Sequence, residues 1–146
     1  NIAGIGGFGM AVELAAMNLE ENSQHITRLE THLLSQLDEK NIDYKINGTR
    51  RVPGVLNITF SHIDGQSLVM QLDMAGIGIS FGAACASGTA KTSTMLLDMG
   101  LTKEDSLSTV RISIGKIHRL EDVEKVISTI HQILIQQSEE FITHEG

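Results

Sequence analysis

Apolar residues recur at helical spacing over the first forty positions. They stand three, four and seven residues apart and would form one stripe along a helix: Val12, Ala16, Leu19, Ile26, Leu29, Leu33 and Leu37. We predict a long helix from about Ile5 to Lys40, with a break near Asn22 and Ser23. Such a helix buries little of itself without a partner along its length. We therefore expect the chain to be a piece of a larger protein.

Beyond residue 40 the apolar residues alternate with polar ones, which is the pattern of strands that bury one face. Four runs of this kind are present, at residues 42–46, 55–60, 77–81 and 110–114. Turn residues bound them, among them Asn47-Gly48 and Pro53-Gly54. The pattern thus predicts four short strands.

Helices are predicted between and after these strands. They run from an N-cap at Asp64 to about Met74, from about Ser93 to Gly100, and from about Leu120 to Gln136; Thr102 with Asp105 forms a further capping pattern. This order predicts an α/β fold of the α+β sandwich type, with a small mixed or antiparallel sheet and helices on one face. The predicted division is a lead-in helix over residues 1–40 and a small domain over residues 41–146.

Charge and composition narrow the classes of partner. Eleven Lys and Arg against 18 Asp and Glu give a net charge of −7, which disfavours nucleic acid and anionic lipid. Aromatic residues are only 3% of the chain, too few to stack on single-stranded bases, and no uninterrupted apolar run is long enough to span a membrane. The single cysteine, Cys85, cannot form an internal disulfide, so we expect a cytoplasmic protein.

A tract of small residues follows the third predicted strand, in a loop over residues 82–92. From Gly82 to Ala90 no side chain is larger than Thr or Cys, so the tract contributes little to a core. Its reactive group is the thiol of Cys85, which such a loop leaves free to swing toward a partner. The alternative is an inert, packed thiol, because free cysteines are among the most buried residue types. Composition leaves both open.

The spacing from Cys85 to Lys91 offers a second interpretation of the loop. A cysteine, five residues and a cation between a strand and a helix is the arrangement of Cys-loop phosphatases and sulfurtransferases, which surround an oxyanion with amides. Those enzymes clamp the oxyanion with the planar guanidinium of an arginine, whereas a lysine supplies a point charge. An independent enzyme of this kind stays an alternative, and so does a non-enzymatic sulfur-relay or interaction domain.

Arg111 is the second candidate site residue. Strand alternation places it on the face opposite Val110, Ile112 and Ile114. An arginine on a strand is suited to hold a carboxylate through two parallel hydrogen bonds. A solvated or salt-bridged arginine at a sheet edge is the other interpretation.

The histidines and methionines are assigned structural places. The six histidines form no His-x-x-x-His pair, so we expect no metal site and place them in solvated helices and loops. The methionines lie at helical spacings and are expected to fill the core: Met10, Met17, Met70, Met74, Met95 and Met99.

Several segments together resemble the C-terminal part of NifS/IscS-type cysteine desulfurases. They are NIAGIGGFG at 1–9, RVPGVLNITF at 51–60, DGQSL at 64–68, GIGIS at 76–80, GAACASG at 82–88, MGL at 99–101 and VRISIG at 110–115. The resemblance covers essentially the whole chain. The loop length after Cys85 is similar to that of the family's long-loop group.

The resemblance implies the small domain of a dimeric, fold-type-I enzyme of the class V aminotransferase superfamily that uses pyridoxal 5′-phosphate. Such enzymes convert L-cysteine to L-alanine and serve pathways such as iron–sulfur cluster assembly. Cys85 matches the family's loop nucleophile, which carries the sulfur as a persulfide to an acceptor or scaffold protein. Arg111 matches the residue that holds the substrate carboxylate.

Three departures from the family pattern accompany the resemblance. The family's cofactor lysine follows a histidine, and no lysine of this chain does. Lys91 and Thr92 replace the usual Glu-Pro, and His118 and Arg119 stand where a threonine usually caps the last helix. We therefore expect the large cofactor-binding domain to be missing, no pyridoxal phosphate on this piece, and no activity from it alone.

Overall fold

The computed structural model describes residues 1–82 and 93–144, with side chains up to residue 137. Its helices and strands follow the chain in this order: α1 Ile2–Met17, α2 Leu19–Glu39, β1 Tyr44–Ile46, β2 Val55–Phe60, α3 Gly65–Met74, β3 Ser80–Phe81, α4 Thr94–Asp98, α5 Lys103–Leu107, β4 Thr109–Ser113 and α6 Leu120–His144. The predicted α/β class is confirmed.

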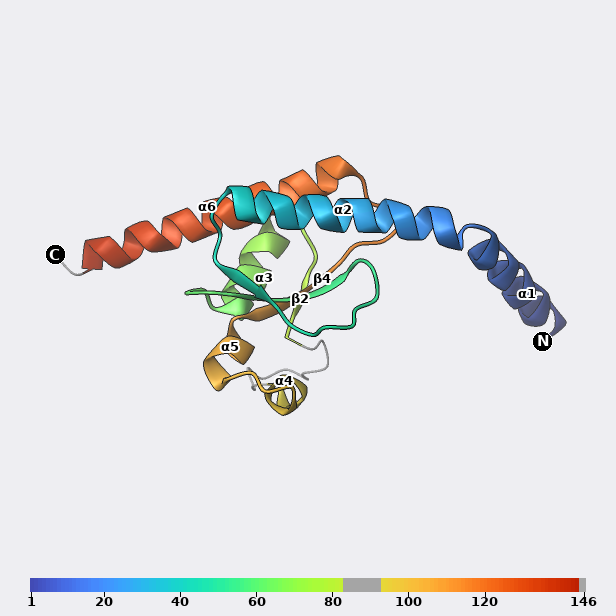
Figure 1. Ribbon diagram of the computed structural model, residues 1–146, viewed down its shortest axis with the longest axis horizontal. Helices are drawn as coiled ribbons and strands as arrows, with labels where there is room; N and C mark the ends of the chain where they lie inside the picture. Colours follow the sequence, from blue (N-terminus) through green and yellow to red (C-terminus); the bar gives the residue numbers. More distant parts are fainter. Residues whose placement is uncertain (83–92, 145–146) are drawn as a thin grey trace.

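The four strands form one antiparallel sheet in the order β1-β2-β4-β3. In the central pair Leu56 lies opposite Ile112 and Ile58 opposite Val110, so their apolar side chains share a face. Helices α2, α3 and α6 lie on that side of the sheet (Figure 1). Strands β2 and β3 both pair with β4 and run in the same direction, and α3 lies in the connection between them. The opposite face of the sheet carries mainly polar side chains, among them Asn57, Ser80 and Arg111.

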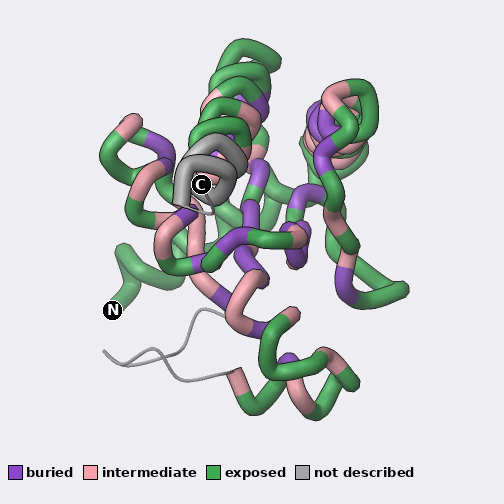
Figure 2. The backbone as a smooth tube through the Cα atoms, turned by 90° about the vertical axis from the view of Figure 1, so that its left-hand side faces the viewer, coloured by how far each residue is buried: buried purple, intermediate pink, exposed green. Residues whose placement is uncertain are grey.

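The core lies between the apolar face and the three helices, where buried residues gather along the inner sides of the backbone (Figure 2). Helix α2 contributes Leu29, Leu33 and Leu37, and α6 contributes Val123, Ile127, Ile130 and Ile133. Half of the predicted lead-in helix therefore packs into the same core as residues 42–133. The division of the chain at residue 40 stays a prediction about domain organisation.

The long N-terminal helix breaks at Asn18, not at the predicted Asn22 and Ser23. The two axes meet at 61° there (Figure 1). The Asn18 side chain donates to the Leu14 carbonyl oxygen at 2.7 Å and its backbone N–H bonds to the same oxygen. This local bonding competes with continued helix, as is typical of asparagine. Asn22 continues α2 because its N–H bonds back to Asn18.

Helix α1 has no buried residue. Apolar side chains are spread around its whole circumference, including Ile5 at 74% and Phe8 at 73% exposed. Within the described residues, no single helix is long and apolar enough to cross a membrane, although the bent pair of α1 and α2 together passes that test of length and composition.

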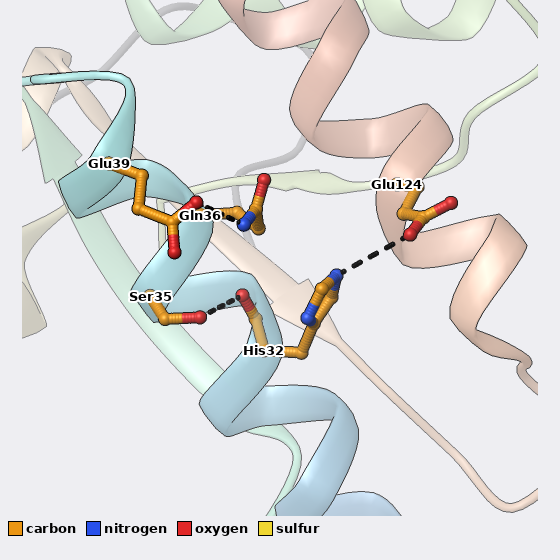
Figure 3. Close-up of polar contacts among 5 residues, drawn as sticks. All are labelled: His32, Ser35, Gln36, Glu39 and Glu124. Atoms are coloured by element: carbon orange, nitrogen blue, oxygen red, sulfur yellow. Dashed lines mark hydrogen bonds and ion pairs between the residues drawn. The ribbon is translucent and has the colours of Figure 1, made fainter.

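Helices α2 and α6 run side by side in the same direction (Figure 1). Their seam holds two histidines that we predicted to be solvated. His25 Nε2 lies 2.9 Å from the His118 carbonyl oxygen. Two helical turns further along α2, His32 Nε2 lies 3.7 Å from Glu124 Oε1 (Figure 3). Because the two histidines are seven residues apart, both lie on the face of α2 that meets α6. The sequence pattern did not reveal this contact between the helices.

Two predicted helix caps are confirmed, and the extents of the third strand and the last helix are corrected. Asp64 Oδ1 accepts from Ser67 N at 2.8 Å and Thr102 Oγ1 accepts from Asp105 N at 3.0 Å, so both predicted caps form. The third strand is only Ser80–Phe81, because Ile77 N bonds to the Leu72 carbonyl and closes α3. The last helix extends beyond residue 136 to His144.

The methionines do not fill the core. All six are at least 49% exposed, from Met99 at 49% to Met74 at 83%. On α3 the buried stripe is Leu68 and Leu72, while Met70 lies on the opposite side of the helix. Helical spacing identifies residues that share a face, but it does not say which of two apolar faces is buried.

Candidate functional site

The candidate site lies on the polar face of the sheet. Three polar side chains form a row across it, because Asn57 on β2 and Ser80 on β3 both pair with Arg111 on β4. The predicted placement of Arg111 opposite Val110 and Ile112 is confirmed. Neighbouring strands stand about 4.8 Å apart, so the row is compact.

The guanidinium of Arg111 is half-buried and only loosely engaged. Its Nη2 lies 3.5 Å from Ser80 Oγ, while its Nε is buried and has no hydrogen-bond partner among the described residues. No described carboxylate forms an ion pair with it. A partly desolvated guanidinium whose Nε has no acceptor among the described residues is an arrangement that a carboxylate ligand satisfies.

A buried hydrogen-bond network lies beside this row. Asn47 Nδ2 donates to Asn57 Oδ1 at 2.9 Å and to Thr59 Oγ1 at 2.8 Å. The Thr59 and Thr109 hydroxyls lie 2.7 Å apart, and the Thr109 hydroxyl donates to the Asp105 carbonyl oxygen at 2.5 Å. Four polar side chains on one face thus connect β1, β2 and β4 to α5.

The network reaches the point where the small-residue tract begins. Gly82 donates its N–H to the Thr109 carbonyl oxygen at 2.8 Å, and its own carbonyl oxygen lies 3.4 Å from Asn57 Nδ2. Residues 83–92 follow directly. The predicted nucleophile Cys85 and the departures at Lys91 and Thr92 therefore lie outside the described residues.

The remaining departure, at His118 and Arg119, forms the entry to α6. His118 Nδ1 accepts from the Gly115 N–H at 2.8 Å, and the Arg119 N–H donates to Asp122 Oδ2 at 2.8 Å. Asp122 thereby satisfies a free N–H at the start of the helix, and its negative charge is favourable there. The absent threonine is replaced by a different cap.

A cavity of about 200 Å³ lies on the other side of the sheet, between α2, α6 and the segment 76–79. Leu33, Ile112 and Val123 contribute apolar side chains to its lining, and Ser113, His118, Asp122 and Lys125 contribute polar ones. Arg111 does not line this cavity. The polar face is the better candidate because Arg111 there has a buried Nε with no hydrogen-bond partner among the described residues.

Among the described residues, lysines are the side chains to which pyridoxal phosphate could be attached. An enzyme of this class attaches the cofactor through a lysine, as a Schiff base. The described lysines all lie on the surface, exposed or partly exposed: Lys40, Lys45, Lys103, Lys116 and Lys125. In residues 1–82 and 93–144, no group of three or more His, Cys, Asp or Glu side chains is placed to hold a metal ion.

Comparison with known proteins identifies the family. The Aminotransferase class-V model matches residues 1–126. The chain belongs to the class-V aminotransferase family. The relatives it matches include two named cysteine desulfurase IscS, from Clostridium botulinum strain Hall, 36% identical over 143 residues, and from Archaeoglobus fulgidus (IscS 1), 33% identical over 136 residues.

These matches cover most of the chain but a minor part of each relative. The match to the Clostridium botulinum protein covers 95% of this chain and 36% of that protein. The match to the Archaeoglobus fulgidus protein covers 92% of this chain and 35% of that protein. A NifS-like protein from Rickettsia africae has a similar structure, with a TM-score of 0.77 at 29% identity, over 92% of this chain and 35% of that one. This class-V chain thus spans about a third of the relatives it matches, and its fold is that of a NifS-like segment.

Sequence reasoning found Arg111 but missed the network beside it. The sequence pattern assigns Asn47 to a turn and Asn57 and Thr59 to a strand, without a further role, and it assigns nothing to Thr109, which also joins the network. The available signal was Asn57, because asparagine is disfavoured in strands and here sits in the middle of an apolar one.

Proposed function

We propose that the chain is the C-terminal part of a cysteine desulfurase, which converts L-cysteine to L-alanine and passes the sulfur to an acceptor protein. The names of the relatives that match 92–95% of the chain support this function. They favour it over an independent Cys-loop phosphatase or sulfurtransferase and over a stand-alone relay domain, because these relatives are named cysteine desulfurases.

The observation that carries the proposal is the state of Arg111. Its guanidinium is half-buried, in register with Asn57 and Ser80, and has a buried Nε without a partner among the described residues. In the proposed role it binds the carboxylate of cysteine through two parallel hydrogen bonds. The carboxylate would replace the hydration that the buried Nε has lost.

Cys85 has the proposed role of sulfur carrier. Its thiolate attacks the sulfur of cysteine, so that an S–S bond forms while the C–S bond breaks; the electron pair of that bond stays with the carbon fragment, which takes up a proton and becomes alanine. An acceptor thiolate then removes the outer sulfur of the persulfide. The sequence places Cys85 three residues after Gly82, the last described residue of the polar face. The segment that contains the proposed carrier thus begins at Gly82, close in the sheet to the proposed carboxylate anchor Arg111.

The complete enzyme would supply what this segment lacks. We place pyridoxal phosphate in that enzyme, as the class-V family implies, and its attachment lysine outside the described residues. A homodimeric parent, a cytoplasmic location and a scaffold protein for iron–sulfur assembly belong to the same proposal. The chain alone would then form no alanine from cysteine.

The test is alanine and sulfide release by the complete enzyme. Arg111→Lys should raise the KM for cysteine about tenfold or more, because an ammonium cannot make the two-point contact. Cys85→Ser should abolish sulfur transfer while cysteine still binds. Wild-type KM in Arg111→Lys, or full transfer by Cys85→Ser, would overturn the two assignments.

The chain alone provides the control. Mixed with pyridoxal phosphate, it should give no new absorbance band from a lysine-bound cofactor. Such a band, traced to one lysine of residues 1–146, would contradict the proposal that the cofactor lysine lies elsewhere.

A further inference from the structure

We propose that Asn57 is a positioning residue, which fixes the point where the chain leaves the sheet at Gly82 relative to Arg111. The inference rests on the proposed function, because it concerns the geometry between the carboxylate anchor and the segment that contains Cys85. Asn57 itself touches neither reacting group in this proposal.

The carboxamide of Asn57 is held in one orientation. Its Oδ1 accepts a hydrogen bond of 2.9 Å from Asn47 Nδ2, which also donates to Thr59 Oγ1 at 2.8 Å. Asn47 is only 5% exposed, so these two bonds are shielded from water. With its oxygen fixed by Asn47, Asn57 directs its Nδ2 toward the Gly82 carbonyl oxygen, 3.4 Å away.

Gly82 is tied a second time to the same network. Its N–H donates to the Thr109 carbonyl oxygen at 2.8 Å, and the Thr109 hydroxyl lies 2.7 Å from that of Thr59. Gly82 has φ +57, a left-handed conformation that turns the chain sharply away from β3. Asn57 and Thr109 therefore hold both polar backbone groups of the residue at which the chain turns.

The row of paired residues on the polar face links Gly82, where the chain leaves the sheet, to Arg111, the proposed carboxylate anchor. Arg111 lies between Asn57 and Ser80, and Ser80 precedes Gly82 by two residues. A β-branched residue at position 57 would suit a strand better, but it would remove one of the two acceptors of Asn47 and leave only Thr59 Oγ1. Sheet formation does not require an amide at position 57. In this proposal, the amide fixes the distance between Arg111 and Gly82.

The test uses three variants. Asn57→Ala removes both hydrogen bonds, whereas the isosteric Asn57→Asp keeps the acceptor for Asn47 and places a carboxylate oxygen against the Gly82 carbonyl. Asn22→Ala is the matched control, since Asn22 on α2 makes no side-chain hydrogen bond to any described residue. Amide hydrogen exchange at Gly82 is measured on this chain, and kcat and KM for cysteine are measured on the complete enzyme.

We expect Asn57→Ala and Asn57→Asp to speed exchange at Gly82 about threefold to tenfold, with the Leu68 amide in the core of α3 unchanged. In the complete enzyme, Asn57→Ala should lower kcat about tenfold and leave KM within about twofold, because Arg111 still binds the carboxylate. Asn22→Ala should change none of these quantities.

Unchanged Gly82 exchange in both variants would overturn the inference. So would faster exchange with wild-type kcat, which would make the network purely structural. A complete wild-type enzyme without desulfurase activity would instead overturn the proposed function, and with it the purpose assigned to Asn57. Exchange is measured without turnover, so the two failures are distinguishable.

Discussion

Gly54 joins the loop before β2 to both α2 and β4. Its N–H donates to Glu30 Oε2 at 2.7 Å, and Glu30 Oε1 lies 3.1 Å from Arg51 Nη2. Its φ is +81, and a Cβ there would lie 2.4 Å from the Ile114 carbonyl oxygen and from Ile26 Cγ2. No side chain fits this position without displacing the backbone.

We therefore expect Gly54→Ala to lower the free energy of unfolding by about 3 kcal/mol, through left-handed strain and steric overlap. Urea unfolding of the chain measures this change. Gly78→Ala is the control, because a Cβ at Gly78 meets nothing within 4 Å. Similar losses in the two variants would show that the packing around Gly54 does not matter.

The environment of Tyr44 in the fold changes the pKa of its phenol. Burial raises the pKa of its phenol to about 12, and the hydrogen bond of 2.8 Å to Asp38 Oδ1 adds to this. The unfolded chain loses the same proton near pH 10. Between about pH 10 and 12 the phenol is thus deprotonated mainly in the unfolded chain. The free energy of unfolding is therefore unaffected by Tyr44 below about pH 10 and falls as the pH rises from 10 toward 12.

Absorbance titration is direct because Tyr44 is the only tyrosine. We expect Asp38→Asn to lower its pKa, but not fully to 10, since burial remains. Glu39→Gln, next in the chain but bonded to Gln36, is the control and should leave the titration unchanged. A wild-type midpoint near 10 would contradict the described environment of Tyr44.

At the scale of elements, α1 and α2 differ sharply although both continue the same apolar pattern. Leu33 on α2 is 1% exposed, whereas Leu14 on α1 is 51% exposed. Leu33→Ala should lower the free energy of unfolding by about 3 kcal/mol by leaving a cavity, and Leu14→Ala should change it by less than about 0.5 kcal/mol. Thermal or urea unfolding checks both, and equal losses would show that α1 is packed too.

The exposed apolar surface of α1 predicts self-association of the isolated chain. A helix that is apolar all round normally lies buried, and α1 has no buried residue. Analytical ultracentrifugation should therefore detect dimers or larger species, which Ile5→Glu with Phe8→Glu should dissociate. A strict monomer at all concentrations would contradict this.

The elements were largely predictable because their signals are local. Caps at Asp64 and Thr102 and the alternation in Val55–Phe60 depend on neighbours in sequence. The bend at Asn18 was misplaced because several polar residues there could end a helix, and the bond to Leu14 decides among them. The seam of His25 and His32 with α6 depends on contacts distant in sequence, which spacing does not encode.

At the scale of the molecule, the sequence indicated which face of the sheet carries Arg111 but not the hydrogen-bond network on that face. Strand alternation placed Arg111 on the polar face, since a strand has only two faces. The buried partnership of Asn47 with Asn57 and Thr59 was not predictable, because it needs the register between β1 and β2. The polar face therefore emerged only when the four strands were paired.

The most direct test of the proposed sulfur transfer is to find where the sulfur goes. The complete enzyme is treated with L-cysteine labelled in its sulfur atom, and the peptide that contains Cys85 is examined by mass spectrometry. We expect one added labelled sulfur on Cys85 in the wild type, much less of it in Arg111→Lys at low cysteine concentration, and its removal by an acceptor thiol. Release of labelled sulfide with Cys85 unmodified throughout turnover would contradict the assignment of Cys85 as the carrier.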